Sequence, residues 1–443
     1  MASKRLVLTP EQIAISEARK AKKAAQATQT VPTVASLVNE EKGRIVERKW
    51  IQIKDTTDAA SGHRVKILTW NLLAQCLVRR ELFPNSDCLK ATQREHMLYR
   101  ELLLQNADIM CLQEVDRLDK LLPVLESAGY KYNYAAGPKK KHGCLIAFKG
   151  YEEINSKMVI YDDQQVRYSD GVSSKGGSFR TKNIGHIVAL KLPDSDQGFI
   201  VATTHLFWHP KYLYERARQT VILKREVIQF KKAVGHENWP CIISGDFNFT
   251  PDDPVYSLMI GDTVLSEQEE KLRPSYVVHK SLDFTIVAGA SSNDENEEEG
   301  VDPDKVITNA RAARPTDGLL SLSELKEIFS QSGSPLKSAY DSGLQVYLQS
   351  WSSDQDKPRT FGDRVPISPS RKGRYEPEWT NYTFYWKLVL DYIFILDAPG
   401  GQSTISGLLS GHRTADIHPG LPQLGVCGSD HVSLCAEIIF TYP

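Results

Sequence analysis

The sequence predicts a mixed α/β protein with one large folded body. Short apolar runs of strand length alternate with longer segments of helical periodicity along most of the chain. The 443 residues are 41% apolar and 25% charged, which is typical of a folded globular protein. We find no internal repeat and no apolar run of about 18 residues, so neither a repeat array nor a membrane span is expected.

The elements follow from local periodicity, and the folded part is expected to begin near Arg64. Residues 65–70 alternate apolar and polar side chains as a strand does, whereas 213–234 place apolar residues on one helical face. The expected strands are 65–70, 107–113, 130–136, 144–149, 184–192, 198–204, 241–244, 389–396 and 432–440. The expected helices are 89–104, 115–128 and 213–234.

Three segments differ from this body in charge. Residues 1–60 form a basic tail with an expected helix over 9–26, and its first 49 residues carry a net charge of +5. An acidic loop near 290–305 is expected to be disordered. A basic, proline-rich loop near 357–377 is expected to be exposed. A single domain is expected over 61–443. The whole chain of 443 residues has a net charge of −1, which excludes a charge-driven DNA-coating protein.

The seven cysteines lack any CxxC spacing, which favours a reducing compartment over a disulfide scaffold or zinc cluster. The N-terminus lacks the apolar region of a secretory signal, so cytoplasm, nucleus or both are expected. A mitochondrial presequence is the less favoured alternative, because the tail contains the acids Glu11 and Glu17.

Polar residues suited to catalysis fall at the ends of the expected strands. They are Trp70-Asn71, Gln113-Glu114, Thr204-His205, Gly245-Asp246-Phe247-Asn248, Asp391 and Ser429-Asp430-His431. Ligand and catalytic groups favour strand ends because a rigid sheet holds them beside a crevice. An oxygen-rich set with few imidazoles suits Mg²⁺, or alternatively Mn²⁺, rather than zinc. Such a cation beside carboxylates and histidines is equipment for phosphoester hydrolysis.

Each residue also has an ordinary structural explanation. Taken alone, Asp246 is a typical turn residue, and Glu114 could cap the helix that follows it. Asp391 is harder to explain, because a carboxylate between apolar neighbours needs a partner, which His431 could supply. The adjacent residues 429–431 are not a serine-hydrolase triad, because neighbours on a strand face opposite ways.

Taken together and in order, these motifs resemble the endonuclease/exonuclease/phosphatase superfamily. The resemblance runs from about residue 66 to 440 and is closest to the deadenylase and nocturnin branch, in particular the fungal Ngl-type RNA exonucleases. Further motifs of that branch are Thr204 to Pro210, Leu336 to Tyr340 and Thr380 to Thr383. The resemblance implies a deoxyribonuclease-I-like fold, a four-layer α-β-β-α sandwich of two packed mixed sheets. It also implies Mg²⁺-dependent release of 5′-nucleotides from an RNA 3′ end.

The resemblance assigns catalytic and metal roles to five residues. Glu114 would bind metal, with Asn71 and Asp430 beside it. Asp246 would activate water, and Asn248 would hold that water or the scissile phosphate.

The remaining roles concern the phosphate and the base. His205 would contact the phosphate, while His431, oriented by Asp391, would stabilise the charged transition state. Pro210 and Trp386 fall where deadenylases sandwich a base. A core aromatic is the ordinary alternative for Trp386. Asn381, in the run Thr380 to Thr383, is expected to bind substrate.

Three departures from the branch bear on the substrate. No leucine-rich repeats precede the catalytic part, so docking to the CCR-NOT complex is not expected. Tyr385 and Leu388 replace an Asp and a Gly of relatives, and Lys141-His142 precedes Gly143 where an Asp is common. These changes adjoin the base pocket of relatives, so strict adenine preference is not expected.

The leading hypothesis is a monomeric Mg²⁺-dependent 3′→5′ RNA exonuclease acting on poly(A) tails or RNA precursor ends such as ribosomal RNA. A phosphatase on a small nucleotide, or a DNA endonuclease, is the first alternative. A non-catalytic interaction protein is the second. Retention of the complete set of costly polar groups favours an enzyme.

Overall fold

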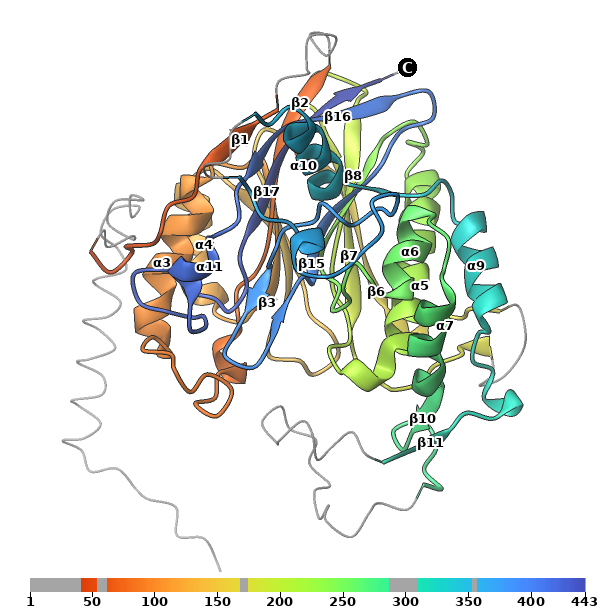
Figure 1. Ribbon diagram of the computed structural model, residues 1–443. Helices are drawn as coiled ribbons and strands as arrows, with labels where there is room; N and C mark the ends of the chain where they lie inside the picture. Colours follow the sequence, from red (N-terminus) through yellow and green to blue (C-terminus); the bar gives the residue numbers. More distant parts are fainter. Residues whose placement is uncertain (1–40, 54–61, 168–173, 287–308, 353–356, 443) are drawn as a thin grey trace, which may run out of the picture.

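Two β-sheets packed face to face form the centre of the computed structural model, with helices on both outer sides (Figure 1). The structure describes residues 41–53, 62–167, 174–286, 309–352 and 357–442. The helix expected over 9–26 and the acidic loop near 290–305 lie outside these residues. In the described part of the chain, no helix is both long enough and apolar enough to cross a membrane.

The first sheet has seven strands, and only one neighbouring pair in it, β2–β3, is parallel. In spatial order its strands are β1 (Trp50–Gln52), β16 (Gln402–Leu409), β17 (Leu434–Thr441), β2 (His63–Asn71), β3 (Ile109–Val115), β5 (Gly143–Phe148) and β4 (Lys131–Ala135).

The second sheet has six strands and again one parallel pair, β8–β9. Its order is β12 (Lys337–Ser338), β15 (Asp391–Leu396), β9 (Cys241–Asp246), β8 (Gly198–His205), β7 (Ile184–Lys191) and β6 (Glu152–Ile160). Two short hairpin-like pairs lie outside both sheets: β10 (Val277–His279) with β11 (Ala310–Ala312), and β13 (Asn381–Tyr382) with β14 (Lys387–Leu388).

Three apolar cores define four layers. The core between the sheets joins residues such as Ile67 and Ile146 of the first sheet to Val201 and Ile393 of the second. The outer face of the first sheet is covered by α3 (Ala91–Leu104) and α4 (Leu118–Ser127). The outer face of the second sheet is covered by α5 (Leu213–Ala233), α6 (Pro254–Ile260) and α9 (Leu322–Gln331). The expected α-β-β-α sandwich of two mixed sheets is thereby confirmed.

The remaining helices are α7 (Ser266–Leu272), α10 (Ala339–Gln349) and the short α11 (Thr414–Ile417). Local sequence explains several helix starts. Ser321 begins α9 with a reciprocal cap, in which its Oγ accepts from the Glu324 N–H and the Glu324 carboxylate accepts from the Ser321 N–H (2.8 Å).

Some expected boundaries are wrong, each for a long-range reason. Val115 ends β3 and does not begin a helix, because it pairs with Gly143 across a bulge. The body begins before residue 61, since β1 pairs with β16. The largely exposed β6 and the strand β16 were not expected, because β6 is a polar edge strand and only the pairing partners of β16 show it to be a strand.

The basic loop near 357–377 is tied to the helices on the second sheet. Arg371 donates to the Thr263 carbonyl and to Ser257 Oγ (2.8 Å), and Lys372 donates to the Ile260 carbonyl (3.0 Å). Two of the loop's cations therefore have a structural role, which is to hold the loop against α6 and the residues that follow it.

Candidate active site

The candidate residues meet where the two parallel strand pairs end. Asn71 at the end of β2 stands opposite Gln113 at the end of β3, directly before Glu114. His205 at the end of β8 stands opposite Asp246 at the end of β9. Parallel neighbours end at the same edge of a sheet, so four separate segments deliver polar groups to one place.

Asn71 joins the two sheets through its side-chain amide. Its Nδ2 donates to Glu114 Oε1 (3.0 Å) and to Asp246 Oδ2 (3.0 Å), while its Oδ1 accepts from the Leu73 N–H (3.0 Å). The Ala74 N–H holds the other Glu114 oxygen (2.8 Å). Asn71 thus fixes two carboxylates, and its expected role beside the metal stays a prediction.

Asp391 and His431 form a buried pair. Asp391 begins β15 opposite Asp246, and its Oδ2 lies 2.8 Å from His431 Nδ1. The other imidazole nitrogen, Nε2, lies 3.6 Å from Asp246 Oδ2. The backbone of His431 is held by the Trp70 indole, which donates to its carbonyl (2.8 Å). The partner expected for Asp391 is therefore present, and it points His431 at Asp246.

His205 lies between the carboxylates of the two sheets. Its Nδ1 is 3.7 Å from Glu114 Oε1, and its Nε2 is 3.5 Å from Asp246 Oδ2. Burial lowers the pKa of His205 to about 3, so the imidazole is neutral at pH 7 and these contacts are not ion pairs. A neutral imidazole can still donate one hydrogen bond to a phosphate oxygen.

The other ionisable groups respond to burial and to each other. Burial raises the pKa of Asp246 to about 7, and the nearby Asp391 adds to that effect. Burial also raises the pKa of Asp430. Burial opposes the charged form of His431, yet the carboxylates of Asp391 and Asp246 outweigh it and hold its pKa well above the ordinary value. A cationic His431 beside Asp246 is the expected state near neutral pH.

Backbone geometry marks two of the residues. Glu114 and Asn248 adopt left-handed conformations, with φ of 55° and 53°, which are uncommon outside glycine. At Glu114 the strand pairing of β3 with β5 shifts register, so the bulge re-aims this side chain. The Asn248 N–H donates to Asp246 Oδ1 (3.0 Å), and its Nδ2 donates to the Leu206 carbonyl (3.0 Å). Local strain thus accompanies the placement of both groups.

The residues fit a hard divalent cation. Three carboxylates are buried around this point, those of Glu114, Asp246 and Asp391, and the carboxylate of Asp430 is half-buried beside them. Burial, and after it the neighbouring Asp391, raise the pKa of Asp246, and a cation bound nearby would favour its charged form. Asp246, Asp391 and His431 also offer ligand atoms within 4.8 Å of one another. Asp391 and His431 are hydrogen-bonded to each other through Oδ2 and Nδ1, so we regard them as a pair and not as metal ligands.

Of the three expected substrate-binding residues, Asn381 contacts a residue of this centre. Asn381 in β13 donates weakly to Asp430, with Nδ2 at 3.4 Å from Oδ2 and 3.3 Å from the carbonyl oxygen. Pro210 begins the 3₁₀ turn Pro210–Tyr212 and is exposed. Trp386 is 43% exposed, so the alternative of a core aromatic is wrong. Pro210 and Trp386 are therefore both accessible to a ligand.

Sequence reasoning gave no role to two groups that position the site, Gln113 and Asn183. Gln113 bridges the sheets, donating to Thr69 Oγ1 (3.2 Å) and Thr203 Oγ1 (2.9 Å). Asn183 holds the His205 carbonyl (2.6 Å). Their signal in sequence is weak, because a polar residue in a buried run shows its partner only after folding.

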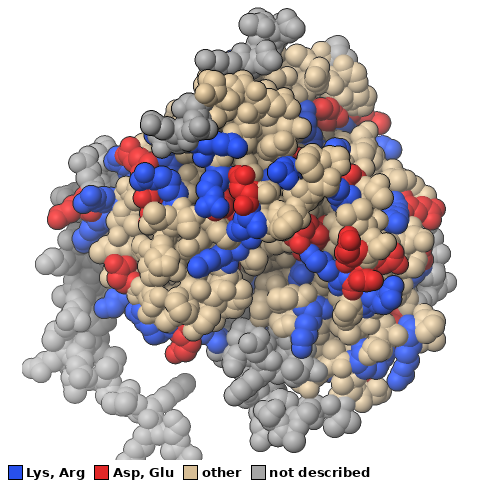
Figure 2. Space-filling view, in the orientation of Figure 1, with Lys and Arg blue, Asp and Glu red and all other residues tan. Residues whose placement is uncertain are grey.

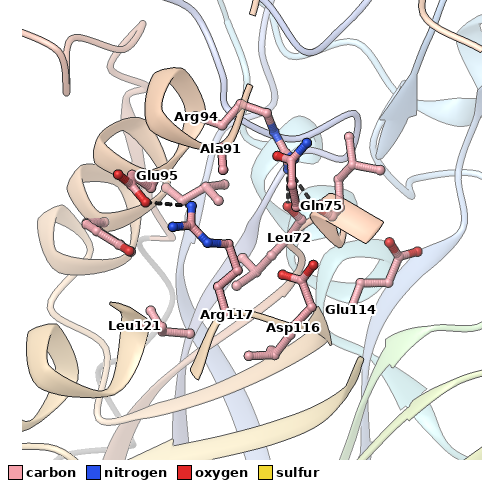
Figure 3. Close-up of a pocket in the computed structure, with 13 residues that line it drawn as sticks. Leu72, Gln75, Ala91, Arg94, Glu95, Glu114, Asp116, Arg117 and Leu121 are labelled. Carbon is pink, nitrogen blue, oxygen red and sulfur yellow. Dashed lines mark hydrogen bonds and ion pairs between the residues drawn. The ribbon is translucent and has the colours of Figure 1, made fainter. Parts of the chain in front are cut away.

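Arg94 of α3 is the largest omission. This buried guanidinium donates to the carbonyls of Leu72 and Leu73 (both 2.6 Å) and of Gly428 (2.6 Å), so it joins the loops that carry Asn71 and Asp430. Figure 3 shows Arg94 in a small pocket on the helical side of the first sheet. Of the expected site residues only Glu114 lines this pocket, and its carboxylate points away from the Arg117–Glu95 ion pair. The pocket is therefore distinct from the catalytic centre.

The fold and this arrangement define a class, the deoxyribonuclease-I-like sandwich with a carboxylate and histidine centre between its two sheets. The chain belongs to the endonuclease/exonuclease/phosphatase family, whose model matches residues 68–431. The family expected from the motifs is thereby confirmed.

Individual relatives refine this comparison. A probable RNA exonuclease of Schizosaccharomyces pombe is 27% identical over 405 residues, covering 84% of this chain and 76% of the relative. The RNA exonuclease NGL2 of Saccharomyces cerevisiae is 27% identical over 448 residues, covering 89% and 81%. Among solved structures, the 2′,3′-cyclic phosphatase ANGEL2 is similar with a TM-score of 0.56 and 20% identity, covering 89% of this chain and 98% of that one.

Proposed function

We propose that this chain is a Mg²⁺-dependent 3′→5′ RNA exonuclease that releases 5′-nucleotides from a single-stranded RNA end. The observation that carries the proposal is the arrangement of Asp246 between Asn71 and the Asp391–His431 pair, with Glu114 on the facing sheet. The names of the relatives from two yeasts, both RNA exonucleases, support RNA as the substrate. The reaction direction and the metal are parts of the proposal.

The hydrolysis needs a water oxygen to attack phosphorus while the bond from phosphorus to the ribose O3′ breaks. Asp246 is placed to accept the proton of that water, since a base whose pKa is near the working pH is effective. Asn71 and Asn248 hold the two Asp246 oxygens and so orient the carboxylate. The product keeps its phosphate at the 5′ side of the released nucleotide.

Negative charge builds up on the phosphate oxygens in the transition state, and hydrogen-bond donors are needed to stabilise it. His431, kept cationic by Asp391, supplies one donor beside Asp246, and neutral His205 supplies another. Glu114 and Asp430, with Asn71 beside them, would hold the cation. When bound, a divalent cation supplies charge neutralisation of the phosphate and the leaving oxygen.

The surface agrees with a local rather than a global source of positive charge. On the face in Figure 2, Lys and Arg side chains are interspersed with Asp and Glu. The whole chain carries a net charge of −1. A phosphate would therefore be attracted chiefly by the site itself.

The test is hydrolysis of 5′-labelled single-stranded RNA by the full chain in Mg²⁺ or Mn²⁺. A ladder that shortens from the 3′ end is expected, and chelation should abolish it. Asp246→Asn should lower kcat by roughly 10²- to 10⁴-fold, because it removes the base but keeps the shape. The matched control is Asp397→Asn, which changes a carboxylate near the other end of β15.

The proposal fails if Asp246→Asn cleaves as fast as the native chain, or if only internal cuts appear. A second candidate, a phosphatase on a 2′,3′-cyclic end, is favoured by the similarity to ANGEL2. The same RNA ending in a 2′,3′-cyclic phosphate separates the two, because that activity removes the end group and leaves the chain length unchanged. NADP⁺ and abasic duplex DNA test the small-nucleotide and DNA alternatives.

A further inference from the structure

The exposed large aromatic side chains of the described residues are Trp208, Phe284, Phe384, Tyr385 and Trp386. All but Phe284 lie on segments that follow or contact residues of the catalytic centre. The other exposed large apolar side chains are all aliphatic: Leu104, Ile154, Met158, Leu265, Val346 and Leu424. Trp208 follows His205 by three residues, and the last three aromatics form the tip of the β13–β14 hairpin. The separation of exposed aromatic side chains from exposed aliphatic ones favours a ligand with flat faces, on which aromatic rings can stack.

The hairpin tip is fixed to the catalytic centre and held rigid. The Tyr382 N–H donates to the carbonyl of Asp430 (3.0 Å), so the hairpin base rests on a catalytic loop. Thr383 closes the turn, because its Oγ1 accepts from the Trp386 N–H (2.8 Å). Phe384 remains 48% exposed and Tyr385 57% exposed on this closed turn. Their rings meet edge to face, with centroids 5.0 Å apart.

Two lysines lie on the same segments as these rings, Lys387 on the hairpin and Lys211 after Trp208. Lys387 follows Trp386 on the hairpin and places its ammonium 4.9 Å from the Tyr382 ring. Lys211 is exposed on the turn that follows Trp208. Aromatic faces with interleaved cations match a single-stranded nucleic acid, whose bases stack and whose phosphates are anionic.

We propose that Phe384 and Tyr385 form a stacking platform for bases of single-stranded RNA upstream of the scissile bond. The inference rests on the proposed function and extends it, because it makes the substrate a polynucleotide several nucleotides long. A mononucleotide held at Asp246 has no second base to lay on this platform. The tip begins one residue beyond the hairpin base that contacts Asp430, so a strand leaving the centre meets it directly.

The experiment compares substrate lengths in the full chain. The variant is Phe384→Ala/Tyr385→Ala, and a second variant, Phe384→Leu/Tyr385→Leu, keeps apolar bulk but removes the flat rings. Ile154→Ala, an exposed apolar change on β6, is the matched control. Each is assayed for kcat/KM on a dinucleotide and on RNA of about twelve nucleotides, a length that covers a typical single-strand footprint. Thermal unfolding checks that each variant folds.

For both hairpin variants, the loss on the long RNA should exceed the loss on the dinucleotide by about 5- to 100-fold, the range for one lost base stack. Equal losses on both lengths, or unchanged cleavage of the long RNA, overturn the platform. If the hairpin variants also bind the long RNA as tightly as the native chain, the tip does not bind RNA, and contact with another protein becomes the better explanation of its exposed rings.

Binding of labelled RNA to Asp246→Asn, with and without the hairpin change, keeps the two proposals separate. If the native chain cleaves no RNA, the proposed function fails. The platform then still stands or falls by whether the hairpin change weakens binding of the long RNA by the same factor.

Discussion

Asp246 is the carboxylate on which the candidate site converges. It accepts from Asn71, lies 3.6 Å from the imidazole that Asp391 orients, and has a pKa of about 7 because it is buried. Each of these contacts joins segments far apart in the chain. At the scale of single residues, the site is therefore a cluster of buried anions that is stable only with its donors and cations in place.

A second buried carboxylate, Glu376, predicts how stability depends on pH. Its Oε1 accepts from the Tyr256 hydroxyl (2.8 Å), and burial raises its pKa to about 8 from the ordinary 4.5. The folded state therefore keeps a proton that the unfolded chain releases. This contribution is full below pH 4.5 and is lost as pH rises through 8. In that window stability should fall by up to about 1.4 kcal/mol per pH unit.

Glu376→Gln mimics the neutral form, so its free energy of unfolding should vary less between pH 5 and 8 and exceed that of the native chain at pH 8. Denaturant unfolding across this range measures both. Glu152→Gln, on the exposed start of β6, is the control and should run parallel to the native curve. Parallel curves for Glu376→Gln would show that Glu376 is ionised in the folded state.

At the scale of elements, the parallel pairs β2–β3 and β8–β9 place the site. In the first sheet the pair β2–β3 brings Asn71 and Gln113 to one edge, and in the second sheet the pair β8–β9 brings His205 and Asp246 to one edge. The antiparallel β15 enters at this edge, so Asp391 begins where Asp246 ends. Two sheets of otherwise antiparallel strands thereby present four strand ends and one strand beginning to one place.

Gly245 is the element-scale weak point. A Cβ at this residue would lie 2.2 Å from the Thr204 carbonyl oxygen of the paired strand. Gly245→Ala must therefore push β8 from β9 and displace His205 from Asp246. We expect a loss of about 1–3 kcal/mol in the free energy of unfolding, together with a reduced kcat.

Gly411→Ala is the matched control, because a Cβ there meets no atom within 4 Å. Unfolding curves and cleavage rates of the two variants give the comparison. A Gly245→Ala variant with native stability and native kcat would contradict the close packing of these strands.

At the scale of the whole molecule, the site spans both sheets. Glu114 comes from the first sheet and Asp246 from the second, and Asn71 donates to both carboxylates. A cation held at Glu114 would also be attracted by the nearby Asp246, so it would stabilise the packing of the two sheets as well as support the chemistry. Any ligand that binds only the folded state raises stability, by about 1.4 kcal/mol at tenfold its Kd.

Millimolar Mg²⁺ should therefore raise the Tm of the native chain relative to the chelated protein. Asp246→Asn removes one buried anion, so its Tm in chelator should equal or exceed the native value, and its gain from Mg²⁺ should be smaller. Differential scanning calorimetry measures all four states. An equal Mg²⁺ gain in both proteins would place the bound cation elsewhere.

Local sequence determined much of this protein. Alternation predicted β2, short apolar runs of strand length predicted β8 and β9, and helical spacing predicted α3 and α5 to within about two residues. Motifs at strand ends named the candidate site residues and the family. These features depend on neighbours in the chain. The tertiary structure alone decided that Arg94 ties two catalytic loops and that Trp386 is exposed. It also decided that β1 joins the first sheet. Such outcomes depend on the register between strands that are hundreds of residues apart. That register is set by packing of the whole core, which no local pattern contains.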